Sequence, residues 1–500
     1  MSAAVIEQPR DENHKQNDND VTSPKTTYPK SENIRITRNV VVIGLAFMIH
    51  FTAFWGTSNL QSTINSDGAL GSTTLAIIYG SLILSNIFLP VNIIRLFGCK
   101  WTIALSFIAY MPFQIAQFAP SFATFIPSAL GVGLGGGPVW CAKCTYLAVA
   151  ADAVASIVGN EGRVKSEVVV VKFFGLFFVF YQMAQVWGNL ISWSVLSYTT
   201  DSENATTTSI NETVIMEQVR NLCGAKFCPG VSSTINPNLI PPEPSKIQML
   251  NVIFVICMVV ACMLVIFGVD SLQRYGVSRR GAGNGVSGLK LLAVTLGLLK
   301  ERYQLLLLPI TMFIGAEEAF VAVDFTASFV ACGWGISRIG FAMICYGVFN
   351  ALASGIAGAL AKVTGRVPIM VAVYLLHGSL LVYMHEWTAV ANDYFAYCLM
   401  AALWGICDGI WLVNVNAFSG ILFPGKEIAA FSNFRLWEST GSVIGYAISS
   451  VFCTSTKLRW LMSLMTVGMV GYGVIEFMEH KAKGRLDRRN LELVNQTSRL

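Results

Sequence analysis

Gly98-Cys99-Lys100 and Thr364-Gly365-Arg366 are short turns that each join two long apolar stretches. Each turn places one basic residue at the membrane edge, and Lys100 and Arg366 are 266 positions apart (366 − 100). Three other residues recur as the same residue type 266 positions later: Phe47 matches Phe313, Ala53 matches Ala319, and Phe54 matches Phe320. The chain therefore contains two copies of one design. A bundle of two halves, each with about six spans, is typical of transporters, whose ligand sites lie between the halves near the bilayer midplane.

The composition identifies the membrane as the solvent. Of the 500 residues, 54% are hydrophobic and only 13% are charged, whereas soluble domains carry about 25% charged residues. Continuous apolar runs without strict alternation predict helices rather than a barrel. We expect an all-α major-facilitator-type bundle of about twelve transmembrane helices in two six-helix halves, since a span needs about 20 residues. The spans begin near residues 39, 74, 101, 122, 168, 247, 304, 337, 368, 394, 430 and 457.

Basic residues and glycosylation signals predict the orientation. Arg and Lys collect on one side of the twelve-span arrangement, which predicts that this side and both termini are cytoplasmic. The opposite side carries two sequons in its longest loop, at Asn204 and Asn211, as expected for an extracellular or lumenal face. The sequence does not separate a plasma membrane from an endosomal membrane, and we expect the plasma membrane.

The same pattern predicts five regions. Residues 1–38 form a disordered cytoplasmic tail, and residues 39–268 form the N-terminal half with the outer loop at 193–246. Residues 269–303 form a cytoplasmic linker with an amphipathic helix, residues 304–479 form the C-terminal half, and residues 480–500 form a second cytoplasmic tail.

Most of the twelve cysteines lie inside spans, where they are expected to serve as small apolar packing residues. Cys223 and Cys228 lie in the outer loop, an oxidising setting, and we expect them to form a disulfide with each other. Cys332 and Cys453 lie near the same face and are the competing partners.

Three acidic residues in the seventh span form the first candidate site. Placing an ionisable side chain in the membrane costs roughly 2.5–3.5 kcal/mol on insertion scales. Glu317, Glu318 and Asp324 therefore indicate a specific role for this span. The seven-residue step from Glu317 to Asp324 predicts one helix face, and Glu318 points about 100° away. Such a group suits a proton or cation site, with His50 of the first span as its partner and His377 as a weaker choice. The alternative is that the acids are neutral and only hold the helix in place.

A second group lies nearer the cytoplasm and suggests an inner gate. It consists of Lys143, Asp408, Arg435 and Glu438. Arg435 and Glu438 are three apart and can pair on one helix. The competing interpretation is a static packing network.

The sequence contains no recognisable catalytic motif, and we expect no enzyme activity, no cofactor, no metal site and no nucleic-acid partner.

Longer strings resemble the uncoordinated-93 (Unc-93) family of major-facilitator-like membrane proteins, and most closely its homolog A branch. They are the stretches that start at Phe51 (FTAFWGTSNLQS), Phe97 (FGCK), Gly135 (GGPVWCAKCTYL), Phe173 (FFGLFF), Val186 (VWGNLIS) and Ala430 (AFSNFRLWES). The resemblance implies a twelve-helix major-facilitator fold and a regulatory partner of a two-pore-domain potassium channel. The alternative is a proton- or cation-coupled carrier of a small-molecule or ion substrate, and in both cases membrane lipid surrounds the chain.

Overall fold

The computed structural model describes residues 30–65, 69–158, 166–197, 222–230, 236–275, 288–388, 393–423 and 426–497. These residues form helices and contain no strand. Eleven of their helical segments are long and apolar enough to cross a membrane. A more polar helix, α15 (Glu427–Ser449), packs against two of these segments, α2 (Leu70–Phe88) and α10 (Arg302–Ala319). The predicted all-helical bundle of about twelve spans is therefore confirmed.

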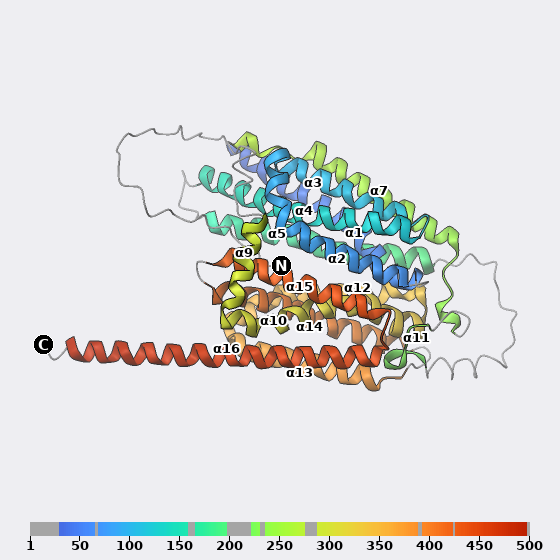
Figure 1. Cartoon of the computed structure of the whole chain (residues 1–500). Helices are drawn as coiled ribbons and strands as arrows, with labels where there is room; N and C mark the ends of the chain where they lie inside the picture. Colours follow the sequence, from blue (N-terminus) through green and yellow to red (C-terminus); the bar gives the residue numbers. More distant parts are fainter. Residues whose placement is uncertain are drawn as a thin grey trace.

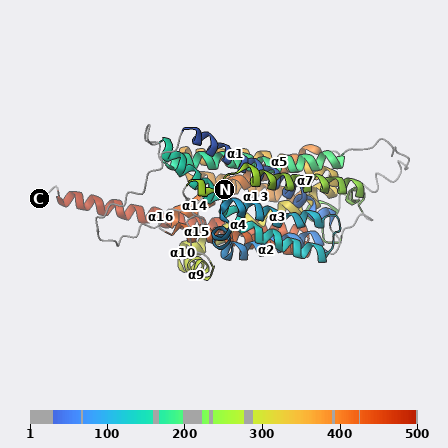
Figure 2. The ribbon, with the colours of Figure 1, turned by 90° about the horizontal axis from the view of Figure 1, so that it is seen from above.

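The helices divide into two groups that lie one above the other in Figure 1 and are seen from above in Figure 2. The first half also contains α1 (Lys30–Ile64), α3 (Pro90–Ala116), α4 (Phe122–Val158), α5 (Ser166–Ser197) and α7 (Pro244–Gly268). The second half also contains α12 (Ile339–Thr364), α13 (Arg366–Glu386), α14 (Tyr394–Leu422) and α16 (Thr454–Thr497). The π-helical stretch η6 (Phe320–Ala331) and the short α11 (Cys332–Trp334) continue α10, and α9 (Gly288–Gly297) contacts α2 and α15.

Both repeated turns depend on a glycine in the same unusual conformation. Gly98 has φ 76° and ψ 165°, and Gly365 has φ 81° and ψ 168°. This region of backbone space is essentially restricted to glycine. The two glycines are 267 positions apart, so the structural repeat is one residue longer than the spacing of Lys100 and Arg366.

The basic residues of the two turns have different surroundings. The Lys100 ammonium lies 5.6 Å from the ring centroid of Trp101. Arg366 donates to both carboxylate oxygens of Glu476 on α16, at 2.6 and 3.1 Å, and lies over Phe418. The second turn is therefore tied to the last helix of its own half.

The halves meet most extensively along two seams, where α5 packs on α12 and α2 packs on α15, and α1 also contacts η6. Gly340 of α12 allows the first contact, because a Cβ there would lie 2.5 Å from the carbonyl oxygen of Asn189 on α5. At the second seam, the ring centroids of Tyr79 and Tyr446 are 5.3 Å apart.

The helices at both ends of the chain extend beyond the predicted spans. Helix α1 starts at Lys30, so residues 30–38 are helical and the prediction of a tail up to residue 38 is wrong for them. Ion pairs to the segment that follows α7 explain the extension: Arg35 binds Asp270 at 2.7 Å, and Arg274 binds Glu32 at 2.5 Å. Helix α16 likewise runs to Thr497, through most of the region predicted as a second tail.

The predicted disulfide between Cys223 and Cys228 is wrong. Cys223 pairs with Cys332, and Cys228 pairs with Cys453. The short segment that contains Cys223 and Cys228 docks on the second half, which brings each thiol to one of the two competing partners. The proximity of Cys223 and Cys228 in the sequence does not predict where their segment docks.

Candidate functional site

A buried acid and a histidine face each other in the core of the second half. Glu317, at the end of α10, is fully buried, and its Oε2 lies 3.7 Å from Nε2 of His377 on α13. The Trp411 indole N–H donates to Nδ1 of His377 at 3.1 Å. In the neutral imidazole the proton therefore resides on Nε2, the nitrogen that faces Glu317. Neither oxygen of Glu317 has a hydrogen-bond partner among the described residues.

Asp408 of α14 extends this acidic cluster toward α12. It is buried and accepts hydrogen bonds from the hydroxyl of Tyr346, at 2.5 Å, and from the amide of Asn350. Asp408 interacts electrostatically with Glu317 and Glu318. Three carboxyl groups thus gather in one half, with His377 beside them. Carboxylates that are buried in the same region of low dielectric repel one another when both are charged, so the cluster is suited to holding protons.

Glu318 connects the cluster to the other half. It is half-buried and interacts with Arg435 of its own half. It also interacts with tyrosines of both halves, Tyr79 on α2, Tyr181 on α5 and Tyr446 on α15. Glu318 is therefore the member of the cluster whose electrostatic neighbours lie on both sides of the seam, as expected for a residue one position, about 100°, from Glu317.

His50 is not the partner of these acids. Its ring stacks on Phe107 with centroids 3.9 Å apart and an interplanar angle of 4°, and Tyr110 packs edge-on against it. Neither ring nitrogen has a hydrogen-bond partner among the described residues. His50 is thus a packing residue of the first half. His377, the weaker candidate, occupies the place next to Glu317.

Asp324 is also separate from Glu317. It forms a buried ion pair with Lys457 at the start of α16, and the hydroxyl of Ser449 donates to it at 3.0 Å. The prediction of one shared face assumed an α-helix, but η6 is π-helical from Phe320. A π-helix has i→i+5 bonds and more residues per turn, so seven residues fall short of two turns.

Only one pair of the predicted inner gate forms. Arg435 and Glu438 are joined at 2.6 Å on α15, as their spacing predicted. Lys143 is buried among aromatic rings, with its ammonium 4.4 Å from the centroid of Phe177, and it makes no ion pair with the described residues. Asp408 is occupied by Tyr346 and Asn350. The expectation of a four-residue network is therefore wrong, because Lys143 lies among rings of the first half and Asp408 is bonded to two residues of α12.

Equivalent phenylalanines in the two halves have chemically different neighbours. Phe47 packs against Phe107 and Phe177 in an aromatic core. Its repeat equivalent, Phe313, packs against His377 and Trp411. The polar cluster therefore belongs to the second half alone. No group of three metal-ligating side chains occurs within the part of the chain that the structure describes.

Sequence reasoning missed several members of this site. Tyr346 and Asn350 are single polar residues in an apolar span, and only their depth, matched to that of Asp408, could have suggested them. Lys457 was passed over because it stands at the beginning of the last span, where a lysine normally faces water. The sequons at Asn204 and Asn211 lie outside the described residues.

The comparisons with known proteins agree on family and fold. Residues 62–475 match the family described as "Ion channel regulatory protein UNC-93". The chain belongs to the UNC-93 family. It is 35% identical to protein unc-93 homolog A of Xenopus laevis, over 89% of this chain and 94% of that one. It is 30% identical to the putative potassium channel regulatory protein unc-93 of Caenorhabditis elegans, over 90% of this chain and 62% of that one.

Solved structures of low sequence identity share the fold of this UNC-93 family member. The nucleoside transporter NupG superposes with a TM-score of 0.60 at 10% identity, covering 88% of this chain and 99% of that one. The major facilitator superfamily transporter FucP, in the outward conformation, superposes with a TM-score of 0.51 at 12% identity, covering 87% and 98%. The chain thus has the major-facilitator fold.

Proposed function

We propose that this chain is a non-catalytic membrane subunit that regulates a potassium channel of the two-pore-domain type. The observation that carries the proposal is its membership of a family described as ion channel regulatory. The Caenorhabditis elegans relative, named a putative potassium channel regulatory protein, aligns with 90% of this chain. We place the protein in the plasma membrane with both termini in the cytoplasm.

Covalent links across the two halves support a regulatory role over alternating access. The segment between α5 and α7, here called the cap (residues 222–230 and 236–239), belongs by sequence to the first half. It is bound to the second half through Cys223–Cys332 and Cys228–Cys453. Asn236 and Asn238 both donate to the carbonyl of Cys332 at 2.9 Å. Leu239 is five peptide units from the start of α7, which limits that connection to roughly 17 Å.

The same disulfides support the proposed orientation. Structural disulfides form and persist in oxidising compartments. The cap end of the bundle is therefore assigned to the extracellular side, where the sequons at Asn204 and Asn211 belong to the same loop. The opposite end carries the turns with Lys100 and Arg366 and is assigned to the cytoplasm.

The decisive experiment combines purification and electrophysiology. The tagged full-length protein is purified from native membranes and, separately, co-expressed with each two-pore-domain potassium channel in oocytes. We expect one channel to co-purify in fixed stoichiometry and its current or surface level to change. If no potassium channel co-purifies and every current stays at its control value, the proposal is wrong.

A carrier remains the second candidate, because one observation favours it. The cluster of Glu317, Glu318, Asp408 and His377 reaches the seam between the halves, the region where major-facilitator carriers bind their substrates. A proton- or cation-coupled carrier of a small solute would use Glu318 as the entry to this cluster.

Charge-neutralising variants distinguish the two candidates. In a carrier, Glu317→Gln and Glu318→Gln should each abolish proton-linked uptake, because glutamine cannot exchange a proton. In a channel partner that contacts the channel elsewhere, the same variants should leave the regulated current largely unchanged. Glu386→Gln is the matched control, since the Glu386 side chain is 79% exposed at the end of α13.

A further inference from the structure

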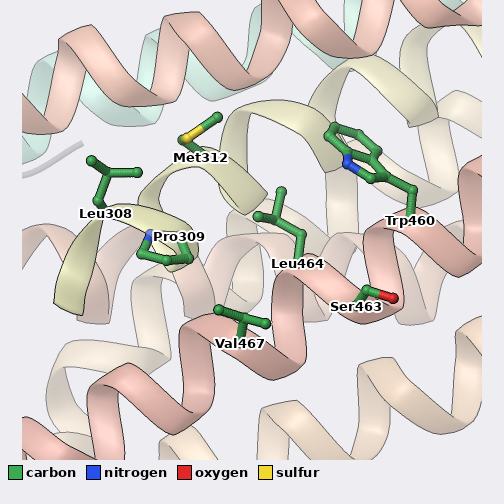
Figure 3. Close-up of a pocket in the computed structure, with 7 residues that line it drawn as sticks. All are labelled: Leu308, Pro309, Met312, Trp460, Ser463, Leu464 and Val467. Atoms are coloured by element: carbon green, nitrogen blue, oxygen red, sulfur yellow. The ribbon is translucent and has the colours of Figure 1, made fainter. Parts of the chain in front are cut away.

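An apolar groove opens on the outer surface of the second half, between α10 and α16. Its volume is about 300 Å³, and it is lined by Leu308, Pro309, Met312, Trp460, Ser463, Leu464 and Val467. Figure 3 shows the α10 and α16 side chains on either side of this space. The lining residues are half-buried or exposed, so the groove is open to its surroundings. In a membrane those surroundings are lipid chains.

The groove lies next to a region where α10 and α16 are in close contact, and the two helices diverge from that region. A Cβ on Gly468 would lie 2.8 Å from Ile310, and one on Gly471 would lie 2.2 Å from the carbonyl of Leu306. Larger side chains, Trp460 and Leu464, replace the glycines toward the start of α16. Pro309 lacks an N–H and cannot continue the bond ladder of α10, which bends a helix at such a position.

An exposed arginine lies one turn from the groove on the same helix face. The Ser463 hydroxyl donates to the carbonyl of Arg459 at 2.8 Å, which places the two residues one above the other. The Nε of Arg459 donates to the Ser455 carbonyl, and its terminal nitrogens have no partner among the described residues. Arginine in this position offers two parallel donors, the geometry that suits phosphate.

The depth of Arg459 matches the level of a lipid headgroup. Arg459 and Glu476, which pairs with Arg366, are 17 residues apart on α16, or about 26 Å along the axis. The hydrocarbon core is about 30 Å thick, so the two charged positions lie near its two boundaries. A long arginine side chain reaches the interface from this depth.

We propose that Arg459 and the α10–α16 groove form a binding site for one phospholipid of the leaflet near the start of α16. The phosphate binds the guanidinium, and one acyl chain fills the groove. The position of Arg459 supports a lipid as the occupant, because a lipid carries a phosphate at the membrane boundary and an apolar chain next to it, as Arg459 and the groove require.

The test uses the full-length protein in nanodiscs that contain phosphatidylglycerol with a photoreactive acyl chain. Cross-linked peptides are identified by mass spectrometry, and Met312, Leu464 and Val467 are expected as labelled sites. Arg459→Gln should reduce labelling roughly tenfold, the effect expected for losing a hydrogen bond between charged groups, and Arg459→Lys should retain part of it.

Two controls separate specific binding from general contact with lipid. Ser463→Phe should block the groove and its labelling, whereas Val470→Phe, at a lipid-exposed position outside the groove, should leave labelling unchanged. A photoreactive diacylglycerol lacks the phosphate, so its labelling should not depend on Arg459. Equal labelling of all lipid-facing helices, or labelling that ignores both Arg459→Gln and Ser463→Phe, would overturn the proposal.

Discussion

At the scale of single residues, Gly365 is held in a conformation that other residues avoid. A Cβ at Gly365 would meet nothing within 4 Å, so any cost of Gly365→Ala is conformational rather than steric. We expect a loss of about 1–3 kcal/mol in the free energy of unfolding, measured by denaturant titration in detergent. Gly473→Ala is the control, because Gly473 is helical and also has open space, and alanine should be neutral or stabilising there. Equal effects at both sites would contradict this explanation of the turns.

The buried pair of Asp324 and Lys457 gives a second prediction at this scale. Both side chains are at most 6% exposed, so removing one partner leaves a charge without compensation. We expect Asp324→Asn or Lys457→Met to lower stability by about 3–5 kcal/mol, seen as a lower melting temperature and less folded protein. The double variant should recover much of this loss, since both charges are then gone. Additive losses would show that the pair acts only through packing.

At the scale of elements, the cap is held by two disulfides of different accessibility. Cys223 and Cys332 are 1% and 0% exposed, whereas Cys228 and Cys453 are half-buried. We expect a graded thiol reductant to open Cys228–Cys453 first. Alkylation followed by mass spectrometry should label Cys228 and Cys453 at lower reductant concentration than Cys223 and Cys332. Simultaneous labelling of all four would mean that the cap unfolds as one unit.

How far the sequence predicts an element depends on how local its determinants are. Apolar length and the repeated turns at Gly98 and Gly365 are local, and the bundle follows from them. The docking of the cap depends on contacts with distant helices, and the apolar pattern of residues 320–331 does not reveal that η6 is π-helical. Asp324 and Cys228 were therefore assigned wrong partners, although each was correctly singled out. The spacing of Arg435 and Glu438 is local again, and their pair forms.

At the scale of the whole molecule, the seams between the halves are reinforced at both ends. The cap binds the second half at one end. At the other, α9 contacts both α2 and α15, and the Asn433 amide of α15 donates to the Thr295 carbonyl of α9 at 2.7 Å. The repeat predicted two halves, but it could not predict these connections, because the linker and the outer loop lie outside the repeat.

The seam between α5 and α12 and the cap should therefore act together. Gly340→Ala pushes a methyl group to within 2.5 Å of the Asn189 carbonyl and should separate α5 from α12, at a cost of about 1–3 kcal/mol. Gly355→Ala, also on α12 but with open space, should have little effect.

The informative comparison is a double-mutant cycle of Gly340→Ala with Cys228→Ser, measured by thermal unfolding under oxidising conditions. If the cap holds the seam closed, the two losses should be non-additive by about 0.5–3 kcal/mol, because each change removes a constraint on the same separation. Strict additivity would mean that the cap and the seam are independent, and it would remove the argument that the disulfides oppose alternating access.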